Sequence, residues 1–140
     1  MTPIEKDQTI ERELTPVKEG VIAVDGLPED IKRVLRCIRD HLFDEPFDVN
    51  AIIACSGVRP SEIYGDFQYH IGISIREYLE ALRMQAAVRL LGYDELKIFL
   101  IAYRLGYTSC SSFGRAFRRY TGDSPTAYRG KMSKENVEGK

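Results

Sequence analysis

Side chains suited to catalysis or metal binding are scarce in this sequence. Only two histidines and three cysteines occur among its 140 residues. The cysteines form no C-x-x-C pair, and neither an H-E-x-x-H nor a G-x-S-x-G motif is present. Cys37 and His41 share a face of a predicted helix, but a packing role is more common for such a pair than a metal site. We therefore expect no catalysis, no metal, no cofactor and buried, free thiols.

Long apolar runs are missing as well. No stretch approaches the roughly 20 apolar residues of a membrane span. The opening segment, MTPIEKDQTIERELTP, is too charged for a signal peptide. We expect a cytoplasmic protein that does not contact membranes. With 140 residues, the chain accommodates a single core but not a small-molecule effector domain beside an output domain.

Acidic residues are almost absent from one region, although the formal net charge of the whole chain is only −1. Residues 97–131 hold seven basic side chains and a single acidic one, Asp123. Residues 1–60 hold 12 acidic and eight basic side chains, and residues 61–96 hold six and three. One end of the protein is therefore expected to attract a polyanion.

Strand signals are also scarce, whereas helix signals follow one another from residue 28 onward. Asp48 and Ser109 are good N-caps, and Ser74 with Glu77 forms a capping box. The pattern predicts an all-α fold of about seven helices. They are expected over residues 28–43, 48–57, 60–71, 74–91, 94–105 and 110–120, with a final turn from residue 124.

The two ends of the chain lack this periodicity. Residues 1–27 are charged, aperiodic and interrupted by Pro3 and Pro16. They are predicted to be an N-terminal arm or a loosely packed extension, with disorder as one outcome. Residues 132–140 are expected to be a C-terminal tail. The folded domain is thus predicted over residues 28–131.

An internal repeat organises this domain. The segments FQYHIGISIREY and FRRYTGDSPTAY align at an offset of 50 residues. The alignment pairs Phe67 with Phe117, Gly72 with Gly122, Ser74 with Ser124 and Tyr78 with Tyr128. Each copy contains a helix, a tight turn at glycine, a second helix and a glycine stop, which is a helix-turn-helix unit written twice. The first motif is expected at about residues 49–71 and the second at about 95–120, joined by a long linker helix at about 74–91.

The segment IAYRLGYTSCSSFGRAFRRYTGDSPTAYR resembles the AraC/XylS-type transcriptional regulators. The resemblance covers about residues 30–130 and is most specific in the second half. In the first half it rests on Gly57, Pro60, Phe67, Gly72, Ser74 and the EYL at 77–79. It implies a bacterial-type, sequence-specific regulator that binds double-stranded DNA, with the second helix of each motif in the major groove.

The second motif carries most of the candidate DNA contacts. Helical spacing places Phe113, Ala116, Phe117 and Tyr120 on one face, which is expected to be the core side. The opposite face collects Ser111, Gly114, Arg115 and Arg118, with Arg119 beside them. By resemblance Arg115 reads a base, because its donors match guanine O6 and N7. Cys110 and Ser111 hold the other base-facing positions.

Two further assignments concern the same helix and its flanks. Gly114 either allows close approach of the backbone to DNA or is a tolerated surface glycine. Contacts to phosphates, which give affinity without sequence preference, are expected from Ser109, Arg118, Arg119, Arg129 and Lys131.

The first motif departs from this pattern. Its outward set is neutral and consists of Ser61, Tyr64, Gly65 and Gln68. Its core set becomes Ile63, Asp66, Phe67 and His70, in which Asp66 and His70 can pair. Ser61 and Tyr64 are its candidate base contacts, and Glu62 would repel phosphate. We expect this motif to fold but to read DNA poorly.

A second function remains open from the sequence alone. A helix-turn-helix adaptor could use its acidic first half to bind another regulator or RNA polymerase, while its arginines dock on an acidic partner. Salt-dependent affinity for arbitrary duplex DNA separates the two interpretations, because an adaptor that binds only proteins has none. We favour the DNA-binding regulator.

Overall fold

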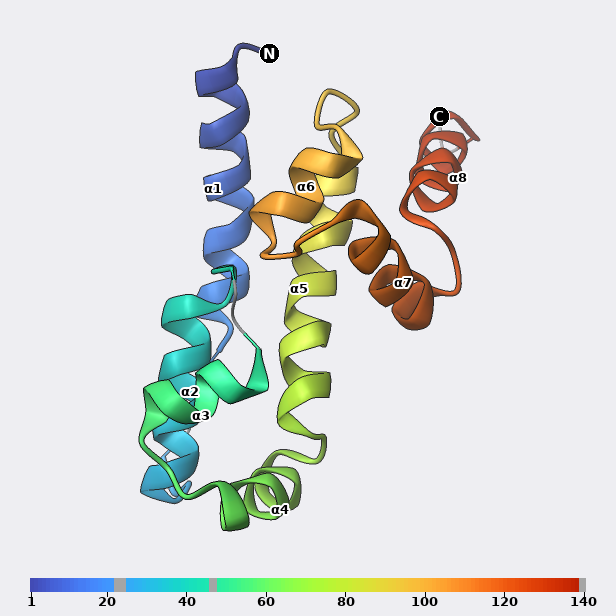
Figure 1. The fold of residues 1–140 in the computed structure, drawn as a ribbon. Coiled ribbons are helices and arrows are strands. Elements are labelled where there is room, and N and C mark those ends of the chain that lie inside the picture. The colour runs from blue at the N-terminus through green and yellow to red at the C-terminus, as the bar shows by residue number, and fades with distance from the viewer. Residues whose placement is uncertain (22–24, 46–47, 139–140) are drawn as a thin grey trace.

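A computed structural model of the chain describes residues 1–21, 25–45 and 48–138. Within these residues the fold is entirely helical, with eight helices and no strand. In chain order they are α1 (Pro3–Glu19), α2 (Glu29–His41), α3 (Val49–Ser56), α4 (Pro60–Ile71), α5 (Ile75–Leu91), α6 (Ile98–Arg104), α7 (Cys110–Thr121) and α8 (Pro125–Glu138) (Figure 1). No helix in the described part of the chain is long and apolar enough to cross a membrane.

The long helix α5 lies at the centre of the fold. Figure 1 shows α3 and α4 beside its N-terminal half and α6, α7 and α8 around its C-terminal half. Ser74 caps this helix, because its Oγ accepts a hydrogen bond from the Glu77 N–H at 3.1 Å. Helices α3 and α4 form the first helix-turn-helix motif, and α6 and α7 form the second. The two motifs and the linker helix are therefore those that the repeat predicts.

The repeat is visible in the packing of aromatic rings. In the first motif Phe67 of α4 meets Tyr78 of α5 edge to face, with ring centroids 5.6 Å apart. In the second motif Phe117 of α7 meets Tyr128 of α8 in the same way, at 5.3 Å. Both phenylalanines are fully buried. The second helix of each motif therefore makes an aromatic contact with the helix that follows it, at equivalent positions of the repeat.

One close contact joins the second motif to the connection that leads from α2 into the first motif. Gly106, in the turn before α7, has a φ of +93°, and a Cβ there would lie 2.8 Å from the Asp44 carbonyl oxygen. Arg83 of α5 fills the same junction, donating from Nε to the Leu42 carbonyl at 3.0 Å. Its guanidinium stacks on the Tyr107 ring at 5.4 Å. Burial lowers the pKa of Arg83 and raises that of Tyr107 to about 12.

The N-terminal segment corrects the sequence prediction of a loosely packed arm. Thr2 and Glu5 form a capping box at the start of α1, where Pro3 occupies a position that tolerates proline. Helix α1 buries Thr9, Ile10, Leu14 and Val17 and packs on α5 and α2. The sequence alone does not indicate a packed helix here, because the apolar stripe is narrow and lies among charged residues and Pro16 occupies the last turn.

Two other boundaries also differ from the prediction. Helix α6 begins at Ile98 rather than near residue 94, because residues 93–96 form a turn in which the Leu96 N–H donates to the Tyr93 carbonyl at 3.0 Å. Helix α8 continues to Glu138, where a single turn and a tail were expected. Tyr128 and Met132 lie one helical turn apart and both pack against the core, which stabilises α8 beyond its first turn.

Candidate nucleic-acid interface

The buried face of α7 fixes the rotation of this helix about its own axis. Phe113, Ala116 and Phe117 are all buried, and the Phe113 and Phe117 rings lie 5.8 Å apart. Ser109 caps the helix, since its Oγ accepts from the Ser112 N–H at 3.0 Å. Tyr120, which was expected in the core, is instead 49% exposed. The helix passes the edge of the core there, and Tyr120 lines a surface hollow beside α5.

The opposite face of α7 points to solvent. Cys110, Ser111, Arg115 and Arg118 are exposed, and Gly114 is half-buried. Among the residues that the structure describes, Arg115 and Arg118 have no ion-pair partner. A Cβ added at Gly114 would meet no atom within 4 Å, so packing inside the chain does not require glycine there. The predicted base-facing residues of the second motif are therefore gathered on one accessible helix face.

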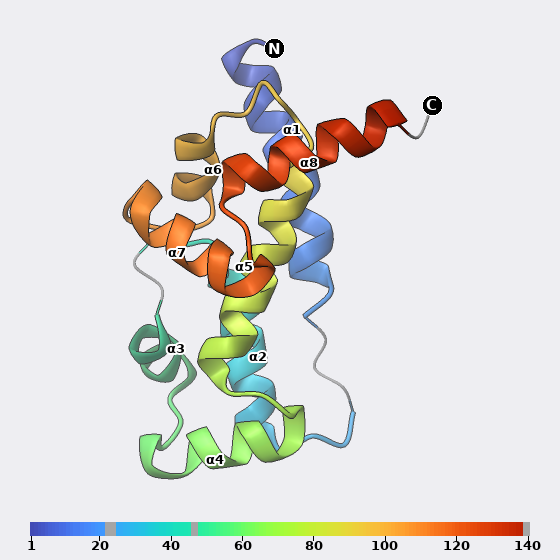
Figure 2. The same cartoon turned by 90° about the vertical axis from the view of Figure 1, so that its right-hand side faces the viewer.

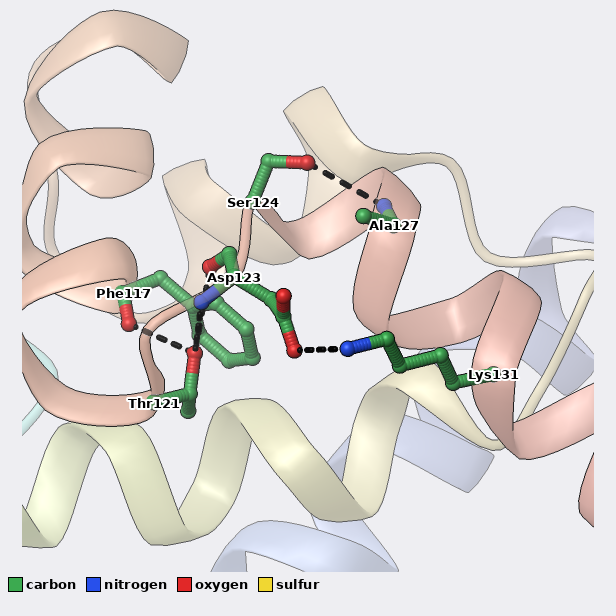
Figure 3. Close-up of polar contacts among 6 residues, drawn as sticks. All are labelled: Phe117, Thr121, Asp123, Ser124, Ala127 and Lys131. Atoms are coloured by element: carbon green, nitrogen blue, oxygen red, sulfur yellow. Dashed lines mark hydrogen bonds and ion pairs between the residues drawn. The ribbon is translucent and has the colours of Figure 1, made fainter.

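Two of the predicted phosphate contacts are engaged in surface ion pairs. Arg119 contacts Glu80 of α5 at 3.2 Å, with 55% of its side chain still exposed. Lys131 Nζ lies 2.9 Å from Asp123 Oδ2 (Figure 3). Such exposed pairs are weak, on the order of 0–1 kcal/mol, and do not prevent either cation from reaching a phosphate.

The connection between α7 and α8 holds Asp123 in place for this pair. Figure 3 shows Thr121 Oγ1 directed at the Phe117 carbonyl, at 2.9 Å, and accepting from the Asp123 N–H at 3.2 Å. Ser124 then caps α8 by accepting from the Ala127 N–H at 3.1 Å. The turn is therefore stabilised by local side-chain bonds to the backbone.

Arg129 does not fit its predicted role at a phosphate. Its Nε donates to the Leu91 carbonyl at 3.0 Å, and Nη2 donates to the Tyr93 and Leu96 carbonyls at 3.1 and 2.7 Å. These bonds hold the connection that follows α5, as Arg83 holds the connection that follows α2. The guanidinium is thereby committed to the interior of the fold, and we leave Arg129 out of the interface.

The first motif presents a different surface. Ile63 and Phe67 of α4 are buried, but Asp66 and His70 are exposed, which corrects the predicted core set. Asp66 lies outside the buried face of α4, which consists of Ile63 and Phe67. The buried face of α7 is wider, because it also includes Ala116 at the position equivalent to Asp66.

The outward residues of α4 lie where the sequence predicts. Ser61, Tyr64, Gly65 and Gln68 are all exposed, together with the acidic Glu62. They form a neutral to acidic surface around the second helix of the first motif.

Residues 53–131, from α3 into α8, match the family described as "Helix-turn-helix domain". The match covers more than half of the chain, and regulators and solved structures that are similar to this chain are of AraC type. The chain belongs to the AraC-type helix-turn-helix family.

Relatives of this AraC-type chain are named as regulators. The arabinose operon regulatory protein of Escherichia coli (strain K12) is 28% identical over 99 residues, covering 71% of this chain and 34% of that protein. The transcriptional activator NphR of a Rhodococcus species is 30% identical over 119 residues, or 82% of this chain and 35% of the relative. The chain thus spans about a third of the length of these two regulators, and 9% of another relative, histidine kinase P4 of Formosa agariphila.

Solved structures share the fold. The C-terminal domain of AraT, a response regulator from Geobacillus stearothermophilus, superposes with a TM-score of 0.70 at 29% identity, covering 76% of this chain and 88% of that one. The DNA-binding domain of AdpA in complex with a target DNA superposes with a TM-score of 0.64 at 29% identity, covering 72% and 90%.

The net charges of the segments do not reveal two exposed cations of the AraC-type domain, Arg59 and Arg76. Arg59 is exposed at the N-cap of α4, at the position equivalent to Ser109. Arg76 is exposed in the first turn of α5 and lines a hollow of about 600 Å³ that also contains Glu77, Glu80 and Arg119. Both lie within or beside acidic stretches, so net charge hid them. The sequence signal for Arg59 is its position directly before Pro60, at the start of the second helix of the first motif.

Cys37 and Cys55 differ from the prediction of buried thiols, whereas Cys110 lies on the accessible face predicted for it. Cys37 is half-buried, whereas Cys55 and Cys110 are exposed. A hydrogen bond with Cys37 raises the pKa of the Cys55 thiol to about 11. Cys55 is therefore accessible but deprotonates less readily than an ordinary thiol.

Proposed function

We propose that this chain binds double-stranded DNA in a sequence-specific manner and regulates transcription, with α7 as its principal reading helix. The observation that carries the proposal is the accessible face with Arg115 and Arg118, on a helix anchored from behind by Phe113 and Phe117. An anchored helix with a polar outer face is the arrangement by which a helix-turn-helix motif enters the major groove.

The residues of this face suit different tasks. Arg115 has no ion-pair partner among the described residues, so its parallel donors are available to guanine O6 and N7. Cys110 and Ser111, one turn earlier, are short and add weak base contacts. Ser109, Arg118, Arg119 and Lys131 supply contacts to phosphates, which set the position of the helix on the duplex.

The first motif contributes less to the proposed recognition. Arg59 can meet a phosphate at the start of α4, while Ser61 and Tyr64 are its candidate base contacts. Exposed Glu62 and Asp66 repel phosphates nearby. We infer unequal use of the two motifs, with most affinity and most sequence preference in the second.

The relatives support the proposal. Several of them are named transcriptional regulators, and the AdpA domain is bound to a target DNA. As part of the proposal, the protein works without catalysis and in the cytoplasm, where a bacterial chromosome lies.

One observation favours a second candidate function. Around the acidic first motif Tyr64 is 47% exposed and Tyr69 is 84% exposed. Exposed tyrosines are common in protein interfaces. An adaptor that binds another regulator or RNA polymerase through α4 would use this surface, either instead of DNA binding or in addition to it.

Selection of bound sequences from random duplex DNA, followed by a salt titration, tests the proposal. We expect an enriched sequence, tighter binding to it than to random duplex, and an affinity that falls steeply as salt increases. An affinity for duplex DNA that is absent, or equal for all sequences, would contradict sequence-specific reading and favour the adaptor.

A further inference from the structure

Helix α1 lies outside the residues that match the family and contacts both halves of the domain. Figures 1 and 2 both show α5 between α1 and α7, so α1 is on the side of the linker helix away from the proposed reading helix. Its apolar stripe, formed by Ile10, Leu14 and Val17, is buried. It packs on α5 and also on α2, which belongs to the first half.

The C-terminal end of α1 reaches the first half a second time. Lys18 Nζ lies 5.7 Å from the centroid of the Phe43 ring, in the connection that leads from α2 to α3. This connection also carries the Leu42 and Asp44 carbonyls, which Arg83 binds.

The N-terminal half of α1 holds the second half of the domain. Arg104, the last residue of α6, forms ion pairs with both Asp7 and Glu11 of α1 and is only 22% exposed. Nearby, Glu13 accepts from Arg89 Nε at 3.0 Å and from the Tyr93 hydroxyl at 2.9 Å. Only 18% of the Glu13 side chain is exposed, so this pair is better shielded from solvent than most on the surface.

These attachments differ in place from the close contact of Gly106 with Asp44, in the connection from α2 to α3. The continuous helix α5 also joins the two halves, since α4, α6 and α7 all pack on it, and a second contact at a distance from this junction further restricts rotation of one half against the other. Asp7 and Lys18 are 11 residues apart on α1, roughly 16 Å along a helix that rises 1.5 Å per residue. Helix α1 therefore provides the second contact.

We infer that α1 is a brace that fixes the orientation of the first motif relative to α7, and that it thereby allows both motifs to engage one duplex together. The part of this inference that concerns DNA rests on the proposed function. The part that concerns the orientation of the two motifs does not depend on the proposed function. Two modules held in the orientation that the duplex requires bind with a higher effective concentration than two modules free to rotate.

Charge reversal tests the brace. The variant Asp7→Lys/Glu11→Lys removes both partners of Arg104 and repels it. The matched control Glu19→Lys/Asp25→Lys makes the same change in net charge at exposed positions that have no ion-pair partner among the described residues. Any general gain in attraction to DNA from the added positive charge is therefore equal in the two proteins.

The first measurement needs no DNA. Spin labels on Cys55 in the first motif and Cys110 in the second, both exposed, report the distance between the motifs in a Cys37→Ala background. This background also removes the hydrogen bond that raises the Cys55 pKa, and so eases labelling. We expect one narrow distance distribution for the parent and the control, and a broader or shifted one for Asp7→Lys/Glu11→Lys. An unchanged distribution in that variant overturns the brace.

The second measurement uses the duplex selected by the parent and a shorter duplex trimmed to the segment that α7 protects from cleavage. The parent and the control should bind the longer duplex more tightly than the short one. For Asp7→Lys/Glu11→Lys the ratio of the two affinities should fall at least about threefold, while its affinity for the short duplex should equal that of the control. An unchanged preference, or a parent with none, overturns the role in DNA binding. If the parent binds no DNA, the proposed function fails, and the spin-label distances still decide whether α1 is a brace.

Discussion

In each helix-turn-helix motif a buried phenylalanine of the second helix meets a tyrosine of the helix that follows, Phe67 with Tyr78 and Phe117 with Tyr128. The outer faces of the same two helices are unlike. Where α7 has Arg115 and Arg118, α4 has Gly65 and Gln68 fifty residues earlier. The buried phenylalanine holds the second helix of each motif against its neighbours, whereas the exposed outer face makes no comparable contact with the core. The motifs therefore share the requirements of folding and differ in the requirements of binding.

The largest expected effect is on the shared interior. Truncating Phe117 to alanine removes a fully buried ring and should lower the free energy of unfolding by about 3–5 kcal/mol. Phe67→Ala should cost a similar amount, because its ring is equally buried and has the equivalent tyrosine partner. Urea unfolding of the two variants measures this. A cost near zero for either one would break the equivalence of the two interiors.

A smaller effect is expected at the two interior arginines. Arg129→Leu removes the side-chain donor of the Leu91 and Leu96 carbonyls and leaves the Tyr93 carbonyl with the Leu96 N–H alone, and an unsatisfied buried group costs about 1–3 kcal/mol. Arg83→Leu should destabilise in the same range, because it strands the Leu42 and Asp44 carbonyls. Melting curves measure the loss. The salt dependence of DNA affinity should not change in Arg129→Leu, and a shallower slope would return Arg129 to the phosphate contacts.

The outer face of the first motif has room for an added arginine. A Cβ at Gly65 meets no atom within 4 Å, so Gly65→Arg is accommodated at the position equivalent to Arg115. Replacing a mid-helix glycine also favours the helix by up to about 1 kcal/mol. We expect tighter DNA binding and a new base preference in the segment that α4 protects, measured by repeating the selection. Gln68→Ala, which adds no donor, is the control. No change in the selected sequence would mean that α4 does not face the bases.

The smallest effect separates the two exposed cysteines. Because the pKa of Cys55 is raised to about 11 by its bond with Cys37, a smaller fraction of it is thiolate near neutral pH than of an ordinary thiol. A maleimide should therefore label Cys110 faster than Cys55 at pH 8. The difference should narrow as the pH rises toward 11, and Cys37→Ala should speed the labelling of Cys55. Faster reaction of Cys55 than of Cys110 in the parent protein would contradict this.

The sequence predicts much of this architecture, because its signals are local. Glycine stops, the caps at Ser74 and Ser109 and the offset of 50 residues locate both motifs and the linker helix. The apolar spacing of α7 also places Phe113 and Phe117 inside and Arg115 outside.

The missed features depend on contacts distant in sequence. Helix α1 has a narrow apolar stripe and is stabilised by distant partners, such as Arg89 of α5, 76 residues from Glu13, and Arg104 of α6, 93 residues from Glu11. Arg129 has the sequence context of a surface cation, but its partners are three carbonyls that lie more than 30 residues away. Tyr120 and His70 have core spacing, but each lies where its helix leaves the core. No periodicity within one helix reveals where its neighbours end.

The most direct test of the account compares the parent protein with Arg115→Ala on the selected duplex and on duplexes in which each guanine of the α7 segment is replaced in turn. Arg118→Ala is the control, since loss of a phosphate contact should weaken binding to all duplexes alike and reduce the salt slope by about 1. We expect the parent to lose about 1–3 kcal/mol of binding free energy when one guanine is replaced, and Arg115→Ala to be insensitive to that replacement while melting like the parent. An Arg115→Ala protein that discriminates at every guanine as the parent does would contradict the claim that this arginine, and with it α7, reads the sequence.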